Sequence, residues 1–231
     1  MSIQCFFRIA VTCTIWMLGN FELFSAEGEG GFRSLFNGSD LSGWVQRGGK
    51  AQYRVENREI VGLAVPGTGN SFLCTEREFT NFVLELDFKV DPTLNSGVQV
   101  RSHAFPTPTE FQTKEKLVKI PAGRVHGYQV EIDPSARAWT GGIYDESRRG
   151  WLFDLKTNEL ARAAFRSNDW NHFRIEAALG HLKTLLNGVP AADLKDDLTP
   201  SGFIGLQVHS VGARTNKLEV RFRNIRISEV P

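Results

Sequence analysis

The sequence predicts an all-β fold in which two antiparallel sheets pack face to face as a sandwich. Three observations carry this prediction. Apolar and polar residues alternate with a period of two along at least six segments, which is the pattern of half-buried strands. Gly, Pro and Asn punctuate the intervals between these segments, and no segment shows sustained helical periodicity. With 231 residues and no linker or repeat after residue 31, the chain is expected to form one domain over 32–231.

The predicted strands follow one another at short intervals. They cover 82–90, 98–101, 128–133, 172–177, 204–209 and 218–223. After the last of these the parity shifts to Ile225 and Ile227, which indicates a β-bulge near Arg223 and Asn224. Asn187-Gly188 predicts a tight hairpin turn, and residues 193–198 could form a single helical turn.

The N-terminal segment differs in composition from the rest of the chain. An apolar run over 9–18 is followed by a polar, Gly-rich stretch, which predicts a signal peptide over 1–26 and a secreted or periplasmic protein. The alternative is an uncleaved membrane anchor, but Asn20 and Glu22 interrupt the run before it reaches the ~20 apolar residues of a membrane span. Cleavage would leave Cys74 alone, so neither a disulfide nor a cysteine zinc site is expected, and Cys74 is interpreted as a small buried residue.

Charge and motifs exclude several functional classes. The formal net charge is +1 and basic residues are spread along the chain, so no nucleic-acid-binding face is predicted. Nucleophile-elbow, phosphate-loop and dinucleotide-binding motifs are absent from the sequence.

One set of polar residues alternates with the core positions of three predicted strands. Its members are Gln99, Arg101, Gln129, Glu131, Gln207 and His209, with Asp133 at a strand end. If these strands are neighbours, the side chains share one face, and a curved sheet makes that face a concave groove. Amides, carboxylates and arginine bind sugar hydroxyls, and aromatic faces stack on sugar rings. The alternative is that these are ordinary residues of a solvated outer face.

Within this set, Arg101 and Glu131 are the strongest catalytic candidates because Gly97 and Gly127 leave space beside them. His209 and His126 compete with Glu131 for the role of base. Glu131 and Asp133, roughly 6.5 to 7 Å apart by strand rise, could act as a carboxylate pair or, with a histidine, hold a divalent metal ion; no spacing requires a cofactor.

Two loops add further candidates. The insertion at 102–124 is long enough to be a lid or a binding loop. The second loop places Trp139, Tyr144 and Trp151 around a Gly-Gly pair, and Trp139 and Tyr144 are predicted to bind substrate together with Gln99, Gln129, Asp133 and Gln207.

An ordered series of motifs resembles the 3-keto-disaccharide hydrolase family over almost the whole chain after residue 31. The motifs are FRSLFNGSDLSGW (32–44), NSGVQVR (95–101), GYQVEID (127–133), TGGIY (140–144), WNHFRI (170–175), LNGV (186–189), GFIGLQVH (202–209) and FRNIRI (222–227). The resemblance implies a concanavalin A-like jelly roll, export, and action on glycosides oxidised at C3. The implied reaction removes the C2 proton, eliminates the C1 aglycone and adds water. Arg101 or a divalent metal would serve the keto oxygen, and His126, His209 or Glu131 would take the proton. Asn57-Arg58 stands where relatives usually have a tight turn of the Asp-Gly type, and shared fold need not mean shared reaction.

Two other functional classes remain open. A non-catalytic carbohydrate-binding module would use Trp139, Tyr144 and Trp151 as its platform, and a structural domain of the envelope would need no convergent polar groups. The expected partner is an oligosaccharide or glycoside, with no nucleic acid and no stable membrane insertion; the sequence predicts no oligomeric state.

Overall fold

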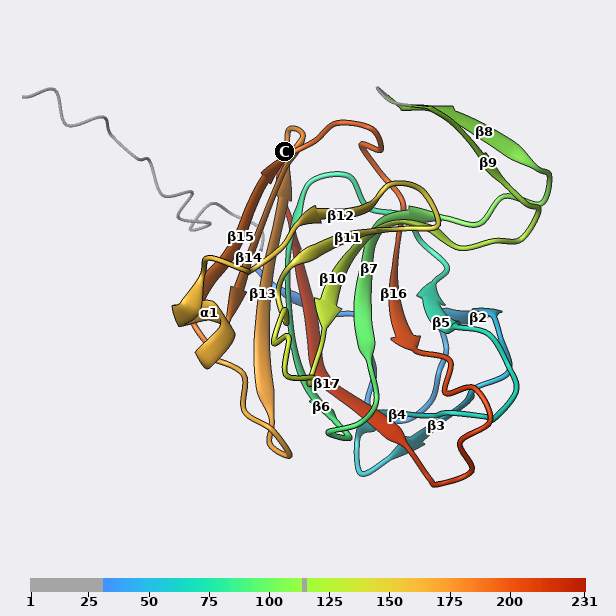
Figure 1. Cartoon of the computed structure of the whole chain (residues 1–231), viewed down its shortest axis with the longest axis vertical. Helices are drawn as coiled ribbons and strands as arrows, with labels where there is room; N and C mark the ends of the chain where they lie inside the picture. The colour runs from blue at the N-terminus through green and yellow to red at the C-terminus, as the bar shows by residue number, and fades with distance from the viewer. Residues whose placement is uncertain (1–30, 114–115) are drawn as a thin grey trace, which may run out of the picture.

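The computed structural model describes residues 31–113 and 116–231, and these residues form two large antiparallel sheets packed on each other (Figure 1). Sheet A has the spatial order β15 (Val189–Lys195), β14 (His181–Leu186), β13 (Asn171–Ala178), β6 (Phe82–Val90), β17 (Glu219–Glu229), β4 (Glu59–Leu63) and β3 (Gln52–Glu56), with β1 (Arg33–Ser34) paired to β17. Sheet B has the order β12 (Gly150–Phe153), β11 (Ile143–Glu146), β10 (His126–Ile132), β7 (Ser96–His103), β16 (Phe203–Val208), β5 (Ser71–Thr75) and β2 (Trp44–Gly48). The predicted all-β sandwich is confirmed.

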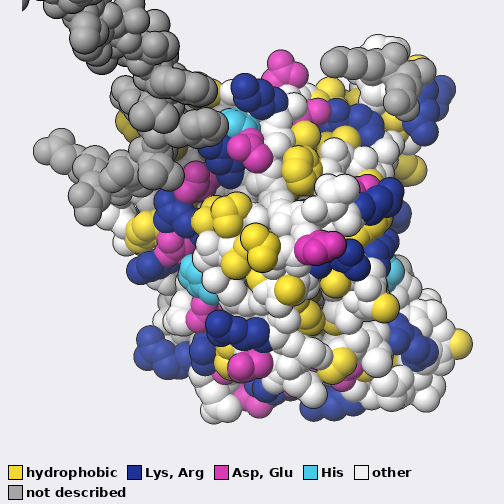
Figure 2. Space-filling view, turned by 60° about the vertical axis from the view of Figure 1, so that its left-hand side comes forward, with side chains coloured by type: hydrophobic (Ala, Val, Ile, Leu, Met, Phe, Trp, Pro, Cys, Tyr) yellow, Lys and Arg dark blue, Asp and Glu magenta, His cyan; other side chains and the backbone are white. Residues whose placement is uncertain are grey.

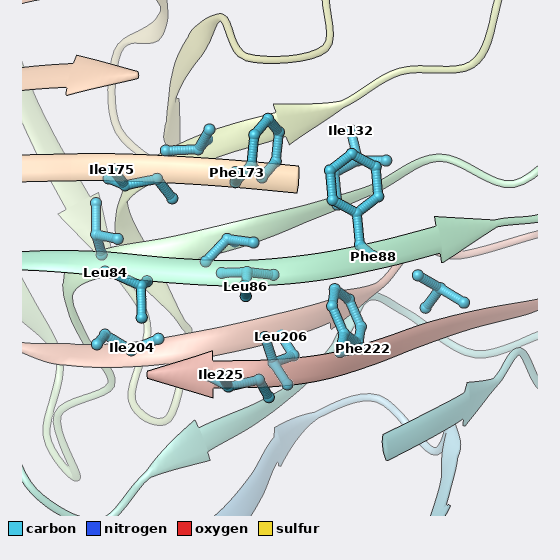
Figure 3. Close-up of a cluster of buried hydrophobic side chains, with 14 of the residues drawn as sticks. Leu84, Leu86, Phe88, Ile132, Phe173, Ile175, Ile204, Leu206, Phe222 and Ile225 are labelled. Atoms are coloured by element: carbon cyan, nitrogen blue, oxygen red, sulfur yellow. The ribbon is translucent and has the colours of Figure 1, made fainter. Parts of the chain in front are cut away.

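The core lies between the inner faces of the two sheets, where the alternating apolar residues meet. Phe88, Phe173 and Phe222 come from three adjacent strands of sheet A and are fully buried (Figure 3). Ile132 and Leu206 reach them from sheet B. Burying one such side chain contributes roughly 1.5–3 kcal/mol, so the sandwich is held mainly by this apolar layer.

The predicted local features are partly confirmed. Asn187 and Gly188, both at positive φ, form the turn between β14 and β15. The bulge is present in β17, where Asn224 has a φ of 53° and the register with β6 shifts. The helical turn predicted at 193–198 is wrong, because β15 runs through Lys195 as a partner of β14. The helix of the described chain is instead α1 (Glu159–Ala163), which Asn158 caps by accepting a hydrogen bond from the Ala161 amide.

The insertion at 102–124 contains a separate hairpin of β8 (Thr109–Gln112) and β9 (Leu117–Ile120). These two strands pair with each other and with no strand of sheets A or B. Figure 1 shows the hairpin projecting from the body of the sandwich beyond the end of β7. It is therefore attached to the body through side chains and its two connecting arms.

The predicted signal peptide at 1–26 lies outside the described residues. No helix among the described residues is long and apolar enough to cross a membrane. Figure 2 shows acidic and basic side chains interspersed over the face turned toward the viewer, without a large area of one sign.

Candidate functional site

The three strands that carry the predicted polar set are neighbours in sheet B. β10 pairs with β7, and β7 pairs with β16. Val98, Val130 and Leu206 are buried in the core, so the residues between them occupy the opposite, outer face of the sheet. The condition stated from the sequence is therefore met, and the outer-face side chains of these strands lie next to one another.

A chain of amide hydrogen bonds crosses this outer face. Gln129 is its centre: its Oε1 accepts hydrogen bonds from Nε2 of Gln99 (2.7 Å) and Nε2 of Gln207 (2.8 Å). The Gln129 Nε2 donates to Oε2 of Glu131 (2.8 Å), and the Ser102 hydroxyl donates to Oε1 of Gln99 (2.7 Å). Each bond fixes the orientation of the next amide, so the chain holds the Glu131 carboxylate in one position.

Glycine makes this arrangement possible. A Cβ on Gly97 would lie 2.7 Å from side-chain carbons of Gln129, and a Cβ on Gly205 would lie 3.3 Å from the Gln99 Cβ. Gly97 lies on β7 and Gly205 on β16, the strands that carry Gln99 and Gln207. Their missing side chains let the long amides lie flat across the sheet rather than stand away from it.

Glu131 is the buried carboxylate at the end of the amide chain. Its Oε1 accepts a hydrogen bond from Nδ2 of Asn95 (2.7 Å) and lies 3.6 Å from Nη2 of Arg137. Burial raises the pKa of Glu131 above the ordinary glutamate value, although the hydrogen bonds from Asn95 and Gln129 oppose this shift. A carboxylate with a raised pKa and a fixed position is suited to accept a proton.

The polar face is closed rather than an open groove. Gln99, Gln129 and Gln207 are at most 3% exposed, and Glu131 is 5% exposed. An apolar cluster of Phe72, Cys74, Val125 and Phe203 lies on its β5 side. Cys74 is buried as predicted, and burial raises the pKa of its thiol to about 12, so it is no nucleophile.

An aromatic cluster lies on the other side of Glu131. Trp151 makes edge contacts with Trp139 (centroids 4.7 Å apart) and Tyr144 (5.3 Å), and all three are half-buried. The Arg137 guanidinium lies over both indoles, 4.7 Å from the ring centre of Trp139 and 4.9 Å from that of Trp151. Tyr144 is paired in register with Gln129, so this partly exposed aromatic surface adjoins the amide chain directly.

Asp133 does not form a carboxylate pair with Glu131. It follows β10 and stabilises the turn after it: Oδ2 accepts from Nε of Arg137 (2.7 Å), and Oδ1 accepts from the Ser135 amide (3.2 Å). Burial alone would raise the pKa of Asp133, but these hydrogen bonds lower it below the ordinary value. Asp133 thus positions Arg137, which lies between the two carboxylates.

Arg101 does not lie on the polar face, so its predicted position is wrong. The backbone at Arg101 has a φ of 46°, and a bulge shifts the register between β7 and β10 at this point. The side chain instead reaches toward sheet A, where Nε donates to the Thr80 carbonyl (2.7 Å) and Nη2 donates to Oδ1 of Asn81 (3.2 Å). A left-handed residue breaks the alternation on which the prediction depended.

The two candidate histidines occupy different places. His209 follows β16, is half-buried, and its Nδ1 lies 2.8 Å from the Ser210 carbonyl oxygen. His126 begins β10 beneath the β8–β9 hairpin, five residues before Glu131, and is fully buried. His126 is therefore not part of the cluster around Glu131.

Three residues near the polar face were not predicted as site residues. Asn95 and Arg137 lie on loops, where alternation gives no information. Glu146 pairs with Gly127 across β10 and β11, is 8% exposed, and has a pKa raised by burial. Glu146 lies two residues after Tyr144 on β11 and therefore faces the same side of the sheet, so the alternation in the sequence could have identified it.

The described part of the chain contains no preformed set of metal ligands. No group of three or more His, Cys, Asp or Glu side chains placed to hold a metal ion occurs in 31–113 or 116–231. The Glu131 and Asp133 oxygens already accept hydrogen bonds from Asn95, Gln129 and Arg137.

A surface hollow of about 310 Å³ lies elsewhere, against β17 of sheet A. Its charged residues are largely held in pairs across the sheet, such as Glu59 with Arg221 (2.9 Å) and Arg223 with Asp87 (3.4 Å). We assign the hollow no chemistry.

Comparison with known proteins supports this fold and its family. The model of the family described as 3-keto-alpha-glucoside-1,2-lyase-like domain matches residues 31–228. A protein of unknown function with a galectin-like fold from Bacillus subtilis superposes with a TM-score of 0.61 at 12% identity, covering 87% of this chain and 97% of that one. A protein provisionally named a glycosyl hydrolase, from Parabacteroides distasonis, gives a TM-score of 0.53 at 18% identity, covering 87% and 94%. No curated protein sequence matches the chain.

Proposed function

Because the chain belongs to the 3-keto-alpha-glucoside-1,2-lyase-like domain family, we propose that it cleaves glycosides that carry a ketone at C3. Membership of this family indicates a carbohydrate-related function. The finer proposal, cleavage by C2 proton removal, rests on one observation: a buried carboxylate of raised pKa, Glu131, is fixed by two amides beside a guanidinium and an aromatic surface.

The ketone determines the chemistry. A C3 carbonyl acidifies the proton on C2, and Glu131 accepts that proton. The electron pair of the C2–H bond forms an enediolate with the C3 carbonyl. When the enediolate collapses, a C1=C2 double bond forms, the C1–O bond breaks, and the aglycone leaves as its alcohol after taking up a proton. Addition of water across the double bond would convert this elimination into net hydrolysis.

The neighbouring residues have distinct parts in this proposal. Arg137, which Asp133 holds in position by accepting from its Nε, stabilises the enediolate oxygen with its positive charge. Asn95 and Gln129 hold the carboxylate in position, and Trp139, Tyr144 and Trp151 provide the surface on which the sugar ring stacks. A divalent cation held by the substrate and Glu131 could polarise the ketone in place of Arg137.

The reaction can be tested directly. Purified protein is incubated with 3-keto-trehalose or a 3-keto aryl glucoside in D₂O, and both aglycone release and deuterium at C2 are followed. We expect release together with C2 exchange, and no release from the unoxidised glycosides. Absence of both, with and without added divalent cations, would refute the enzyme proposal; loss of activity on chelation alone would assign the electrophile to a metal.

We also propose that the protein acts outside the cytoplasm after removal of residues 1–26. Amino-terminal sequencing of the protein recovered from the producing cells tests this. A mature chain that begins near residue 27 is expected, whereas an intact N-terminus in the membrane fraction would favour the anchor.

A binding module is the second candidate, and the exposure pattern favours it. The aromatic cluster is partly open to solvent, whereas the Glu131 side chain is only 6% exposed. Calorimetry with unoxidised glycans distinguishes the two: tight binding without turnover of any 3-keto glycoside would support a module.

A further inference from the structure

A second buried glutamate lies on the same face of sheet B as Glu131. Glu146 pairs with Gly127 and Tyr144 pairs with Gln129, and the register between β10 and β11 is regular over these residues. Residues in register point to the same side of a sheet, and Gly127, Gln129 and Glu131 alternate with core positions along β10. Glu146, Tyr144 and Glu131 therefore share the outer face, and Glu146 is 8% exposed.

The hydrogen bonds of Glu146 leave one of its oxygens available. Its Oε1 accepts from the Ser147 hydroxyl (3.2 Å), and no hydrogen bond to its Oε2 occurs within 31–113 or 116–231. Both oxygens of Glu131 and both of Asp133 already accept. Asp145, one residue before Glu146, points to the other side of the sheet and is paired with two arginines. Of these four acids, Glu146 is the one that can contact a ligand through an oxygen not already bonded to the described chain.

The surroundings of the two glutamates favour different protonation states. The Glu131 carboxylate accepts from two amides and lies 3.6 Å from a guanidinium nitrogen, and these contacts favour its ionised form. Glu146 accepts one hydrogen bond, and burial raises its pKa. The Ser147 hydrogen bond and the charges of Arg124 and His209 oppose that rise only in part. Glu131 is therefore suited to take up a proton, and Glu146 is suited to give one up.

Tyr144 lies between the two glutamates on this face. Gln129, its partner in register, is midway between Glu131 and Gly127 on β10. Since Gly127 lies opposite Glu146, the backbone positions of the two glutamates are roughly 13 Å apart along the strand direction. Burial raises the pKa of the Tyr144 phenol, and the negative charges of Glu146 and Glu131 raise it further, so both carboxyl groups act on this phenol. A sugar ring stacked at Tyr144 therefore has one glutamate on each side, as in enzymes whose paired acids flank a glycosidic bond.

We propose that Glu146, in its protonated form, donates a proton to the glycosidic oxygen as the aglycone leaves. The O–H bond of Glu146 breaks, its proton goes to the glycosidic oxygen, and that oxygen keeps the electron pair of the C1–O bond. In the hydration step, the Glu146 carboxylate takes a proton from the water whose oxygen adds to C1, and Glu131 returns its proton to C2. Both carboxyl groups thereby regain their starting states.

This role rests on the proposed function, in which Glu131 removes the C2 proton, and it has a measurable signature in the leaving group. A nitrophenolate departs without a proton, whereas a methyl glycoside needs a proton to release methanol. Loss of the acid should therefore slow the release of methanol far more than the release of nitrophenol. Loss of the base Glu131 should slow both, because both reactions begin with removal of the C2 proton.

Two glycosides of the same configuration test this role. Methyl and 4-nitrophenyl 3-keto-α-glucosides are incubated in D₂O with the wild type, Glu146→Gln and Glu146→Asp, and circular dichroism checks that each variant is folded. Glu146→Gln should release methanol about 10²–10⁴-fold more slowly than the wild type and nitrophenol less than about tenfold more slowly, while deuterium still enters C2 of the methyl glycoside. Glu146→Asp keeps a carboxylic acid and should restore part of the methanol release. Glu159→Gln, at an exposed position of α1, is the control and should match the wild type on both glycosides.

Equal losses on the two glycosides, or no loss on either, would overturn the role of Glu146. Loss of C2 exchange together with methanol release would also overturn it, because removal of the C2 proton needs no proton donor at the aglycone. In each of these cases a wild type that cleaves both glycosides would leave the proposed reaction standing. A wild type inactive on both would instead refute the proposed reaction, and the role of Glu146 with it.

Discussion

The outer faces of the two sheets are both polar, but they are built differently. On sheet A, the polar residues are charged and paired across strands, as where Glu85 bonds Arg174 (2.7 Å) and Arg226, and these arginines remain in contact with solvent. On sheet B, the equivalent positions hold Gln99, Gln129 and Gln207, which bond one another away from solvent. Polarity on an outer face therefore does not identify a site. The proposed site differs from sheet A in having uncharged amides beside glycines that end at one buried carboxylate.

The largest expected effect comes from the single carboxylate that ends the amide chain. Glu131→Gln keeps the shape of the side chain but replaces one acceptor oxygen with a donor nitrogen and removes the base, so activity on 3-keto glycosides should fall by about 10²–10⁴-fold. Glu85→Gln on sheet A is the matched control and should leave activity within about twofold. Rates of aglycone release measure both, and equal losses in the two variants would erase the distinction between the faces.

The next effect concerns stability. Gln129→Ala removes the acceptor of two buried amides and a donor to Glu131, so the free energy of unfolding should drop by about 2–4 kcal/mol. Arg221→Ala on sheet A breaks ion pairs that water can replace and should cost at most about 1 kcal/mol. Urea unfolding measures both; a larger loss for Arg221→Ala would show that the charged face is the more stabilising one.

Replacing a glycine next to the amide chain should destabilise the protein more than replacing a glycine elsewhere. The Cβ of Gly97→Ala would meet Gln129 at 2.7 Å, and moving the amide should cost about 1–3 kcal/mol with some loss of activity. Gly69→Ala, where nothing lies within 4 Å of the new Cβ, should be close to neutral. Thermal unfolding compares the two, and equal melting temperatures would contradict the close packing at Gly97.

The smallest effects are in the pH dependence, where the two faces should behave oppositely. Glu131 has a pKa raised above 4.5, so its ionisation opposes folding, and protonation as the pH falls toward the raised pKa relieves that cost. For Glu85, burial would raise the pKa, but hydrogen bonds from Arg226 and Arg174 lower it below 4.5. The ionised Glu85 carboxylate therefore stabilises the folded state above pH 4.5, and this contribution is lost as the pH falls through the lowered pKa.

Urea unfolding from pH 7 to pH 3 separates these contributions. Relative to Glu131→Gln, the wild type should gain stability as the pH falls from 7 toward the raised pKa of Glu131. Relative to Glu85→Gln, it should lose stability as the pH falls below about 4.5. Aglycone release should rise with pH through a value above 4.5. An activity limb at or below the ordinary glutamate pKa would exclude Glu131 as the base.

The sequence predicted the parts of the molecule that depend on regular alternation. The sandwich and the bulge at Asn224 follow from apolar periodicity and turn residues, whereas the adjacency of β7, β10 and β16, which the sequence left as a condition, is a property of the sheet topology. The position of Arg101 was predicted wrongly because Arg101 itself has a positive φ, which ends the alternation. No neighbouring Gly or Asn in the sequence indicates that conformation. Arg137 was missed because its position depends on the turn that Asp133 stabilises, which is a tertiary feature.

The pairing of β1 with β17 has a topological consequence. Arg33 lies opposite Ile227, and its guanidinium bonds Glu229 (2.9 Å), so the first and last strands of the sandwich meet side by side. A short linker could join these two places and new ends could be opened after the exposed Gly188 of the β14–β15 turn, giving a circularly permuted chain with the same sheets. The sandwich could equally be carried within a loop of a host protein, since its two attachment points need be no farther apart than two neighbouring strands.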